Sequence, residues 1–126
     1  MTKTPMHYEI SQKFYFDAAH TLNREVQADS SRRIHGHTYN AEVTLAGQPD
    51  ADNGMVVDLG VVRLAVDQLR TRLDHHLLDD IPGLGPATLE NLCSFIWREL
   101  ALTLPGLTAV RVWRDSVGDS CRLSAA

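Results

Sequence analysis

Residues 35–45 read HGHTYNAEVTL, and this stretch decides the fold. Its apolar side chains alternate with polar ones, which predicts a β-strand with one buried face; the buried set is Tyr39, Ala41, Val43 and Leu45. Alternate side chains of a strand share a face, so His35 and His37 are predicted to point at one ion, with Gly36 leaving room between them. The competing interpretation is an ordinary turn with two exposed imidazoles.

A second alternating stretch precedes this one. In residues 8–20 the apolar phase is broken only by Gln12, which predicts a strand that ends near His20. Residues 21–33 (TLNREVQADSSRR) are polar and aperiodic, so they are predicted to form a loop. Antiparallel pairing of the two strands would bring His20 close to the His-Gly-His tripeptide. Three imidazoles with an open fourth position suit Zn²⁺.

The remaining elements follow from spacing and caps. Residues 55–57 (MVV) are predicted to be a short strand, and Asp58 to cap a helix that ends near Leu73. A second helix is predicted to begin at Thr88, with Cys93 as a small buried side chain, followed by strands over 108–113 and 121–123. The order ββααββ predicts an α+β fold, an antiparallel four-stranded sheet with two helices on one face.

Composition sets the broad class. A chain of 126 residues with 44% apolar residues is predicted to form one domain, residues 1–126. The net charge of −4 and the absence of a basic run give no reason to expect nucleic-acid binding. No apolar stretch approaches the ~20 residues that span a bilayer, so no membrane association is expected. Two cysteines make no disulfide framework, and a reduced, cytoplasmic protein is expected.

Six short motifs together resemble a known family. They are 16–20 (FDAAH), 34–39 (IHGHTY), 54–59 (GMVVDL), 73–75 (LDH), 87–92 (ATLENL) and 104–107 (LPGL). In this order they resemble the 6-pyruvoyl-tetrahydropterin synthase family, which includes the 6-carboxy-tetrahydropterin synthases of queuosine biosynthesis. The resemblance implies the tunnelling fold (T-fold), in which trimers close their sheets into a barrel and two trimers stack into a hexamer. It also implies zinc on His20, His35 and His37, with active sites at subunit interfaces.

The resemblance further assigns catalytic and binding roles. Asp74 and His75 would form an acid–base relay lent by a neighbouring subunit, and Glu90 would lie along the pterin pocket with the backbone of Thr88 and Leu89. The family's substrate is 7,8-dihydroneopterin triphosphate, whose side-chain hydroxyls a Lewis-acidic zinc would help to ionise. Taken alone, without the resemblance, Asp74-His75 is better interpreted as a helix-end histidine near the C-terminal dipole with a local partner.

The chain departs from the family pattern at two positions. Ser31 stands where the family has a catalytic cysteine, and a serine hydroxyl is a weak base unless a neighbour activates it. Glu25 or Asp29 in the same loop are alternative bases. Arg114 stands where the family has a glutamate that holds the pterin, with Asp115 one residue later; a one-residue shift in a strand changes the face.

These observations support two functions for the protein, one enzymatic and one non-enzymatic. The first is a zinc-dependent lyase or synthase acting on a dihydropterin side chain, by retro-aldol cleavage or as a true synthase with Ser31 or a loop acid replacing the thiol. The alternative is a non-catalytic or re-purposed zinc protein that binds a different heterocycle or an anionic ligand, for which Arg114 is the best argument. In each case the partners expected are a small pterin-like molecule and further copies of the chain.

Overall fold

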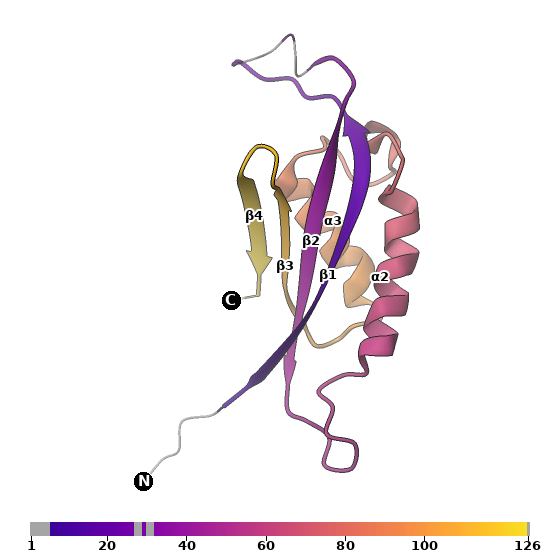
Figure 1. Cartoon of the computed structure of the whole chain (residues 1–126), viewed down its shortest axis with the longest axis vertical. Coiled ribbons are helices and arrows are strands. Elements are labelled where there is room, and N and C mark those ends of the chain that lie inside the picture. Colours follow the sequence, from indigo (N-terminus) through magenta and orange to yellow (C-terminus); the bar gives the residue numbers. More distant parts are fainter. Residues whose placement is uncertain (1–5, 27–28, 30–31, 126) are drawn as a thin grey trace.

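The computed structural model describes residues 6–26, 29 and 32–125. Within these ranges the predicted order of strands and helices is confirmed, with one short 3-10 helix added. The elements are β1 (Tyr8–His20), β2 (His35–Gly47), α2 (Leu59–Leu73), η1 (Leu78–Asp80), α3 (Leu89–Ala101), β3 (Leu107–Arg114) and β4 (Asp119–Ser124). The strands form one antiparallel sheet in the order β1-β2-β3-β4 (Figure 1).

The two long strands pair along their whole length. Phe16 lies opposite Tyr39, and their rings stack with centroids 5.2 Å apart. The same register places His20 opposite His35 at the upper end of the sheet in Figure 1. The alternation in the sequence therefore fixes both the buried face and the position of the histidines.

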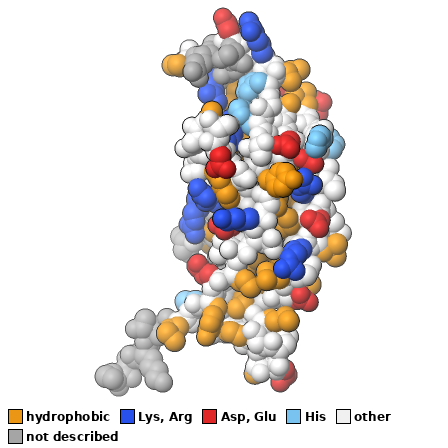
Figure 2. Space-filling model, in the orientation of Figure 1, with side chains coloured by type: hydrophobic (Ala, Val, Ile, Leu, Met, Phe, Trp, Pro, Cys, Tyr) orange, Lys and Arg blue, Asp and Glu red, His pale blue; other side chains and the backbone are white. Residues whose placement is uncertain are grey.

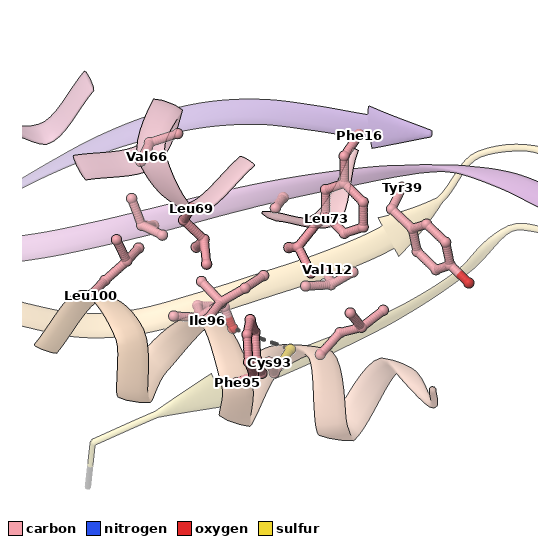
Figure 3. Packing of buried hydrophobic residues seen from close by; sticks show 14 of the residues in the cluster. Phe16, Tyr39, Val66, Leu69, Leu73, Cys93, Phe95, Ile96, Leu100 and Val112 are labelled. Carbon is pink, nitrogen blue, oxygen red and sulfur yellow. Dashed lines mark hydrogen bonds between the residues drawn. The ribbon is translucent and has the colours of Figure 1, made fainter. Parts of the chain in front are cut away.

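Both helices cover one face of the sheet. Helix α2 packs against β1, and α3 packs against β3 and β4. Asp58 caps α2 as predicted, since its Oδ1 accepts from the amide of Gly60 at 2.8 Å. The apolar stripes of the helices meet the inner face of the strands in one core, seen in Figure 3; its buried members include Val66, Leu69, Leu73, Phe95, Ile96, Leu100 and Val112. Cys93 is buried there, as predicted.

The prediction of a strand over residues 55–57 is wrong. The backbone here closes a loop, because the carbonyl of Met55 accepts from the amide of Asp50 at 2.9 Å. Val57 packs against the core from this loop without a sheet partner. An apolar run of three residues can bury its side chains equally well from a loop or from a strand, so the run alone does not predict a strand. No helix in the described part of the chain is long and apolar enough to cross a membrane.

Candidate metal centre and adjoining cleft

Three histidines converge where β1 ends and β2 begins. The ring centroids of His20 and His35 are 4.5 Å apart, those of His20 and His37 are 4.9 Å apart, and those of His35 and His37 are 5.0 Å apart. One nitrogen from each ring lies within 4.8 Å of the other two. Figure 2 shows histidine side chains reaching the surface at this end of the sheet and again near the end of α2. Three such nitrogens make a donor set that could hold a metal ion.

Backbone carbonyls orient two of these rings. Nδ1 of His20 donates to the carbonyl of Ala87 at 3.0 Å, and Nδ1 of His35 donates to the carbonyl of Arg33 at 2.8 Å. Each ring then carries its lone pair on Nε2. The Nε2 of His20 is buried and has no hydrogen-bond partner within the described ranges. A buried acceptor left unpaired is costly, and a carbonyl on the opposite nitrogen is the usual support for a metal-binding histidine.

Burial also favours the neutral, metal-binding form of the rings. It lowers the pKa of His20 below its usual value. Burial, followed by the charge of Arg114, lowers the pKa of His37 to about 4. A ring that is neutral near pH 7 offers its lone pair to a cation without first losing a proton. Three imidazoles with converging nitrogens fit zinc in its three-histidine arrangement.

Arg114 lies beside the histidines at the end of β3. The residue is only 7% exposed, and its Nη1 donates to Nε2 of His37 at 3.2 Å. A neutral imidazole has a single lone pair, so a metal ion bound at this nitrogen would replace the bond to Arg114. Its Nε donates to Oδ1 of Asp119 at 3.0 Å, and its Nη2 donates to the second oxygen of the same carboxylate. These bonds raise the pKa of Arg114 and lower that of Asp119. A buried guanidinium in two-point contact with a carboxylate is held in a fixed orientation.

A cavity of about 280 Å³, which we call the histidine cleft, opens next to His20 and Arg114. Its wall includes the start of α3, where the hydroxyl of Thr88 accepts from the amide of Asn91 at 3.1 Å. The cleft is lined by His20, Leu22, Asn23, Arg24, Tyr39, Ala87, Thr88, Leu89, Glu90, Arg114 and Asp119. All three residues of the α3 start singled out from the sequence are in this list, whereas Asp115 is not.

Asp74 and His75 form a bonded pair at the end of α2. One carboxylate oxygen of Asp74 accepts from the amide of Asp17 at 2.9 Å, and the other accepts from Nδ1 of His75 at 2.8 Å. These two bonds, in that order, lower the pKa of Asp74. His75 has a positive φ of 60° and a side chain that is 79% exposed. A non-glycine residue held in this conformation is strained, and such strain is common at functional sites.

The His75 pair faces a different cavity from the histidine cleft. His75, His37, Thr38 and Asp17 are among the residues that line a second cavity, of about 560 Å³. Within one chain, therefore, the Asp74–His75 pair does not line the histidine cleft, which contains Glu90 and Arg114.

Comparison with known proteins assigns the family. A model of the family described as "6-pyruvoyl tetrahydropterin synthase" matches residues 9–124. The chain belongs to this family. It is 34% identical over 109 residues to the 6-carboxy-5,6,7,8-tetrahydropterin synthase of Synechocystis, covering 82% of this chain and 83% of that protein. It is 35% identical over 104 residues to the 6-pyruvoyl tetrahydrobiopterin synthase of Poecilia reticulata, covering 71% of each.

Solved structures of the 6-pyruvoyl tetrahydropterin synthase family share the fold. The 6-pyruvoyl tetrahydropterin synthase of Caenorhabditis elegans superposes with a TM-score of 0.80 at 22% identity, covering 100% of both chains. An uncharacterized protein of Wolinella succinogenes superposes with a TM-score of 0.77 at 17% identity, covering 97% of this chain and all of that one. The T-fold prediction is thus confirmed. The relatives' names support the expected class, an enzyme that makes tetrahydropterins.

The structure brings some of the predicted site residues together and places others elsewhere. The three histidines lie together, and Thr88, Leu89 and Glu90 share a cleft with His20; their roles stay predictions. Asp115 is turned away, and its carboxylate accepts from the side-chain amide of Asn40 at 3.3 Å. Ser31 lies outside the described residues.

Sequence reasoning missed Asp119, which pairs with Arg114 across the β3–β4 hairpin. The signal for it was a cation on the buried phase of β3, which required a carboxylate from the next strand.

Proposed function

We propose that this member of the 6-pyruvoyl tetrahydropterin synthase family is a zinc-dependent enzyme that acts on the side chain of 7,8-dihydroneopterin triphosphate or a related dihydropterin by lyase chemistry. The observation that carries the proposal is the buried Nε2 of His20, which has no hydrogen-bond partner among the described residues, lies beside two further imidazoles and belongs to a residue that lines the same cleft as Glu90. His20, His35 and His37 would hold the zinc. When bound, zinc supplies a Lewis acid that eases ionisation of a substrate hydroxyl.

The chain's own residues would supply substrate binding and proton transfer. The start of α3 would hold the ring, with the carboxylate of Glu90 accepting from ring N–H groups. His75 is oriented through Nδ1 by Asp74, its side chain is 79% exposed, and it would exchange protons with the substrate. Because His75 faces a different cavity from Glu90, we propose that His75 serves the cleft of a neighbouring copy in a trimer or a dimer of trimers.

The chain has no cysteine at the position of the family's catalytic base. We propose Ser31, or one of the loop acids Glu25 and Asp29, for this role. A Ser31→Cys variant tests whether the site is a synthase: if the exchange creates synthase activity that the natural chain lacks, the natural reaction is a different one.

Incubation of zinc-loaded protein with 7,8-dihydroneopterin triphosphate and with 7,8-dihydroneopterin tests the function directly. The pterin products are separated by chromatography and identified by mass. We expect turnover that is lost in His20→Ala, strongly reduced in His75→Gln and retained in the neighbouring His76→Gln. Absence of any product from either compound, with binding intact, would contradict the enzymatic proposal.

Mixing variants tests the shared site. In their own oligomers, His20→Ala chains are expected to be inactive and His75→Gln chains to be strongly reduced in activity. If a site takes its metal ligands from one chain and its relay from another, co-refolded mixtures regain activity, because some interfaces combine two intact partners. Mixtures as inactive as the separate variants would show that each site is built within one chain.

The alternative function is a zinc protein that binds a different heterocycle or an anionic ligand without turnover. Arg114, buried at the cleft in the place of an expected glutamate, favours it. Binding without product in the incubation above would support this alternative.

A further inference from the structure

Arg70 lies in the last turn of α2, four residues before Asp74, and contacts the Asp74–His75 pair directly. Its Nη2 lies 3.3 Å from Oδ2 of Asp74, the same oxygen that accepts from Nδ1 of His75. The other carboxylate oxygen, Oδ1, accepts from the amide of Asp17. Of these three neighbours of the carboxylate, Arg70 is the one with a permanent charge.

Two contacts with Tyr15 on β1 hold the guanidinium of Arg70 in place. Its Nε donates to the carbonyl of Tyr15 at 2.6 Å, and its central carbon lies 5.0 Å from the centroid of the Tyr15 ring. A planar guanidinium held at one edge by a carbonyl and on one face by a ring presents its remaining N–H groups in a fixed direction. Arg70 therefore meets Asp74 from a preset position.

Arg72, two residues further along α2, forms an ion pair of a different kind. Its Nη1 lies 2.6 Å from a carboxylate oxygen of Glu99, and its guanidinium carbon lies 5.3 Å from the centroid of the Phe95 ring. These contacts join α2 to α3, whereas those of Arg70 join α2 to β1 beside the Asp74–His75 pair. Ion pairs at the surface add little to stability, so stability alone does not account for the set of contacts around Arg70.

The charge of Arg70 also acts on the protonation of the pair. The amide of Asp17 and Nδ1 of His75, followed by the charge of Arg70, lower the pKa of Asp74, which is therefore ionised near neutral pH. A cation next to this carboxylate offsets part of its negative charge, and this disfavours a second positive charge on the imidazole. Three further titratable groups, Asp17, His37 and His76, line the same cavity as His75.

We infer that Arg70 is a positioning residue for the Asp74–His75 pair, because it holds the Asp74 carboxylate in the orientation that aligns the His75 ring. The side chain of His75 is 79% exposed, so its orientation depends on the bond to Asp74. Displacement of a reacting group by about 1 Å can lower a rate about 10²-fold. The inference rests on the proposed function, in which His75 exchanges protons with the substrate, and it goes further by naming the residue that controls the orientation of His75.

Nitrogen NMR of the histidine rings tests the inference on the protein alone. Protein with ¹⁵N-labelled histidine is measured above the pH range in which histidine titrates, and the His75 signals are assigned by their loss in His75→Gln. We expect the natural chain to carry the ring proton on Nδ1, since Asp74 accepts from that nitrogen, and Arg70→Gln to show the averaged signals of both tautomers. Arg72→Gln is the matched control and is expected to keep the natural signals.

Steady-state kinetics of the zinc-loaded protein, with whichever of the two dihydropterins it turns over, measure the consequence. Arg70→Gln is expected to lower kcat by about 10-fold to 10²-fold with KM little changed, because substrate binding does not involve Arg70. The acid limb of its pH–rate profile should move to higher pH by about half a unit, the effect of losing a unit charge about 6 Å away in water. Arg70→Lys keeps the charge without the planar contacts, so it should keep the natural acid limb and regain part of the rate.

The outcomes separate the inference from the proposed function. Natural tautomer signals in Arg70→Gln overturn the inference, as does a natural kcat in that variant. The same loss in Arg72→Gln also overturns it, because the effect then belongs to the end of α2 in general. The expected NMR change in a protein that turns over neither dihydropterin contradicts the proposed function and supports the positioning role. Circular dichroism verifies folding; should Arg70→Gln not fold, Arg70→Met, whose unbranched side chain can still cover the Tyr15 ring, takes its place.

Discussion

Acid should destabilise this protein well above the pH at which its carboxylates are protonated. His37 has a pKa of about 4 in the folded chain against an ordinary value of 6.5 for histidine, chiefly because the ring is buried. As the pH falls below 6.5, the unfolded chain takes up the proton first, so the free energy of unfolding decreases until the pH reaches the folded pKa. On this basis, acidification from about pH 7 to about pH 5 lowers the free energy of unfolding by about 2 kcal/mol. Because the ring is partly exposed and solvent screens it, the expected decrease is between about 1 and 2 kcal/mol.

Urea unfolding of metal-free protein, at one chain concentration and at both pH values, measures this decrease. His37→Gln removes the titrating group, so the pH-dependent loss should shrink by the amount given above. His76→Gln, which removes an exposed imidazole, is the matched control and should retain the full loss. The reasoning is refuted if His37→Gln and the natural chain lose the same stability on acidification.

Three further predictions concern helix capping, the core and the relay. Asp58→Ala removes the cap of α2 and should lower the free energy of unfolding by about 1 kcal/mol, measured in urea; no change would mean that the cap bond contributes nothing. Phe16→Ala leaves a cavity beneath Tyr39 and should cost about 3–5 kcal/mol in the same assay, and a loss below about 1 kcal/mol would contradict the packing. His75→Gln should bind as much zinc as the natural chain but turn substrate over more slowly by about 10²-fold or more; a parallel loss of zinc would show that His75 supports the metal instead.

Local periodicity predicted the strands and their buried faces, and antiparallel pairing of the first two strands predicted that His20 lies close to the His-Gly-His tripeptide. The apolar positions of β1 and β2 repeat every two residues, and a register that buries Phe16 against Tyr39 also sets His20 against His35. The position of the three histidines therefore followed from packing alone. The same rule fails for residues 55–57, because a short apolar run packs against the core whether or not it pairs with a strand.

The cleft was less predictable because it depends on contacts between distant segments. Alternation along β3 puts Arg114 on the buried face with Val112, but only the length of the following turn brings Asp119 opposite it. The carbonyl of Ala87, which fixes the orientation of the His20 ring, comes from 67 residues along the chain. No local pattern encodes such a contact. The family resemblance supplied the roles of Glu90 and His75, which periodicity could not supply.

Metal binding tests the central claim most directly. Metal-free protein is dialysed against a small excess of Zn²⁺, and bound zinc is determined by elemental analysis for the natural chain and for His20→Ala, His35→Ala, His37→Ala and His76→Ala. We expect one zinc ion per chain in the natural protein and in His76→Ala, and a loss of binding in each of the other three. Zinc binding that persists in His20→Ala, or a natural chain that takes up no zinc, would contradict the account.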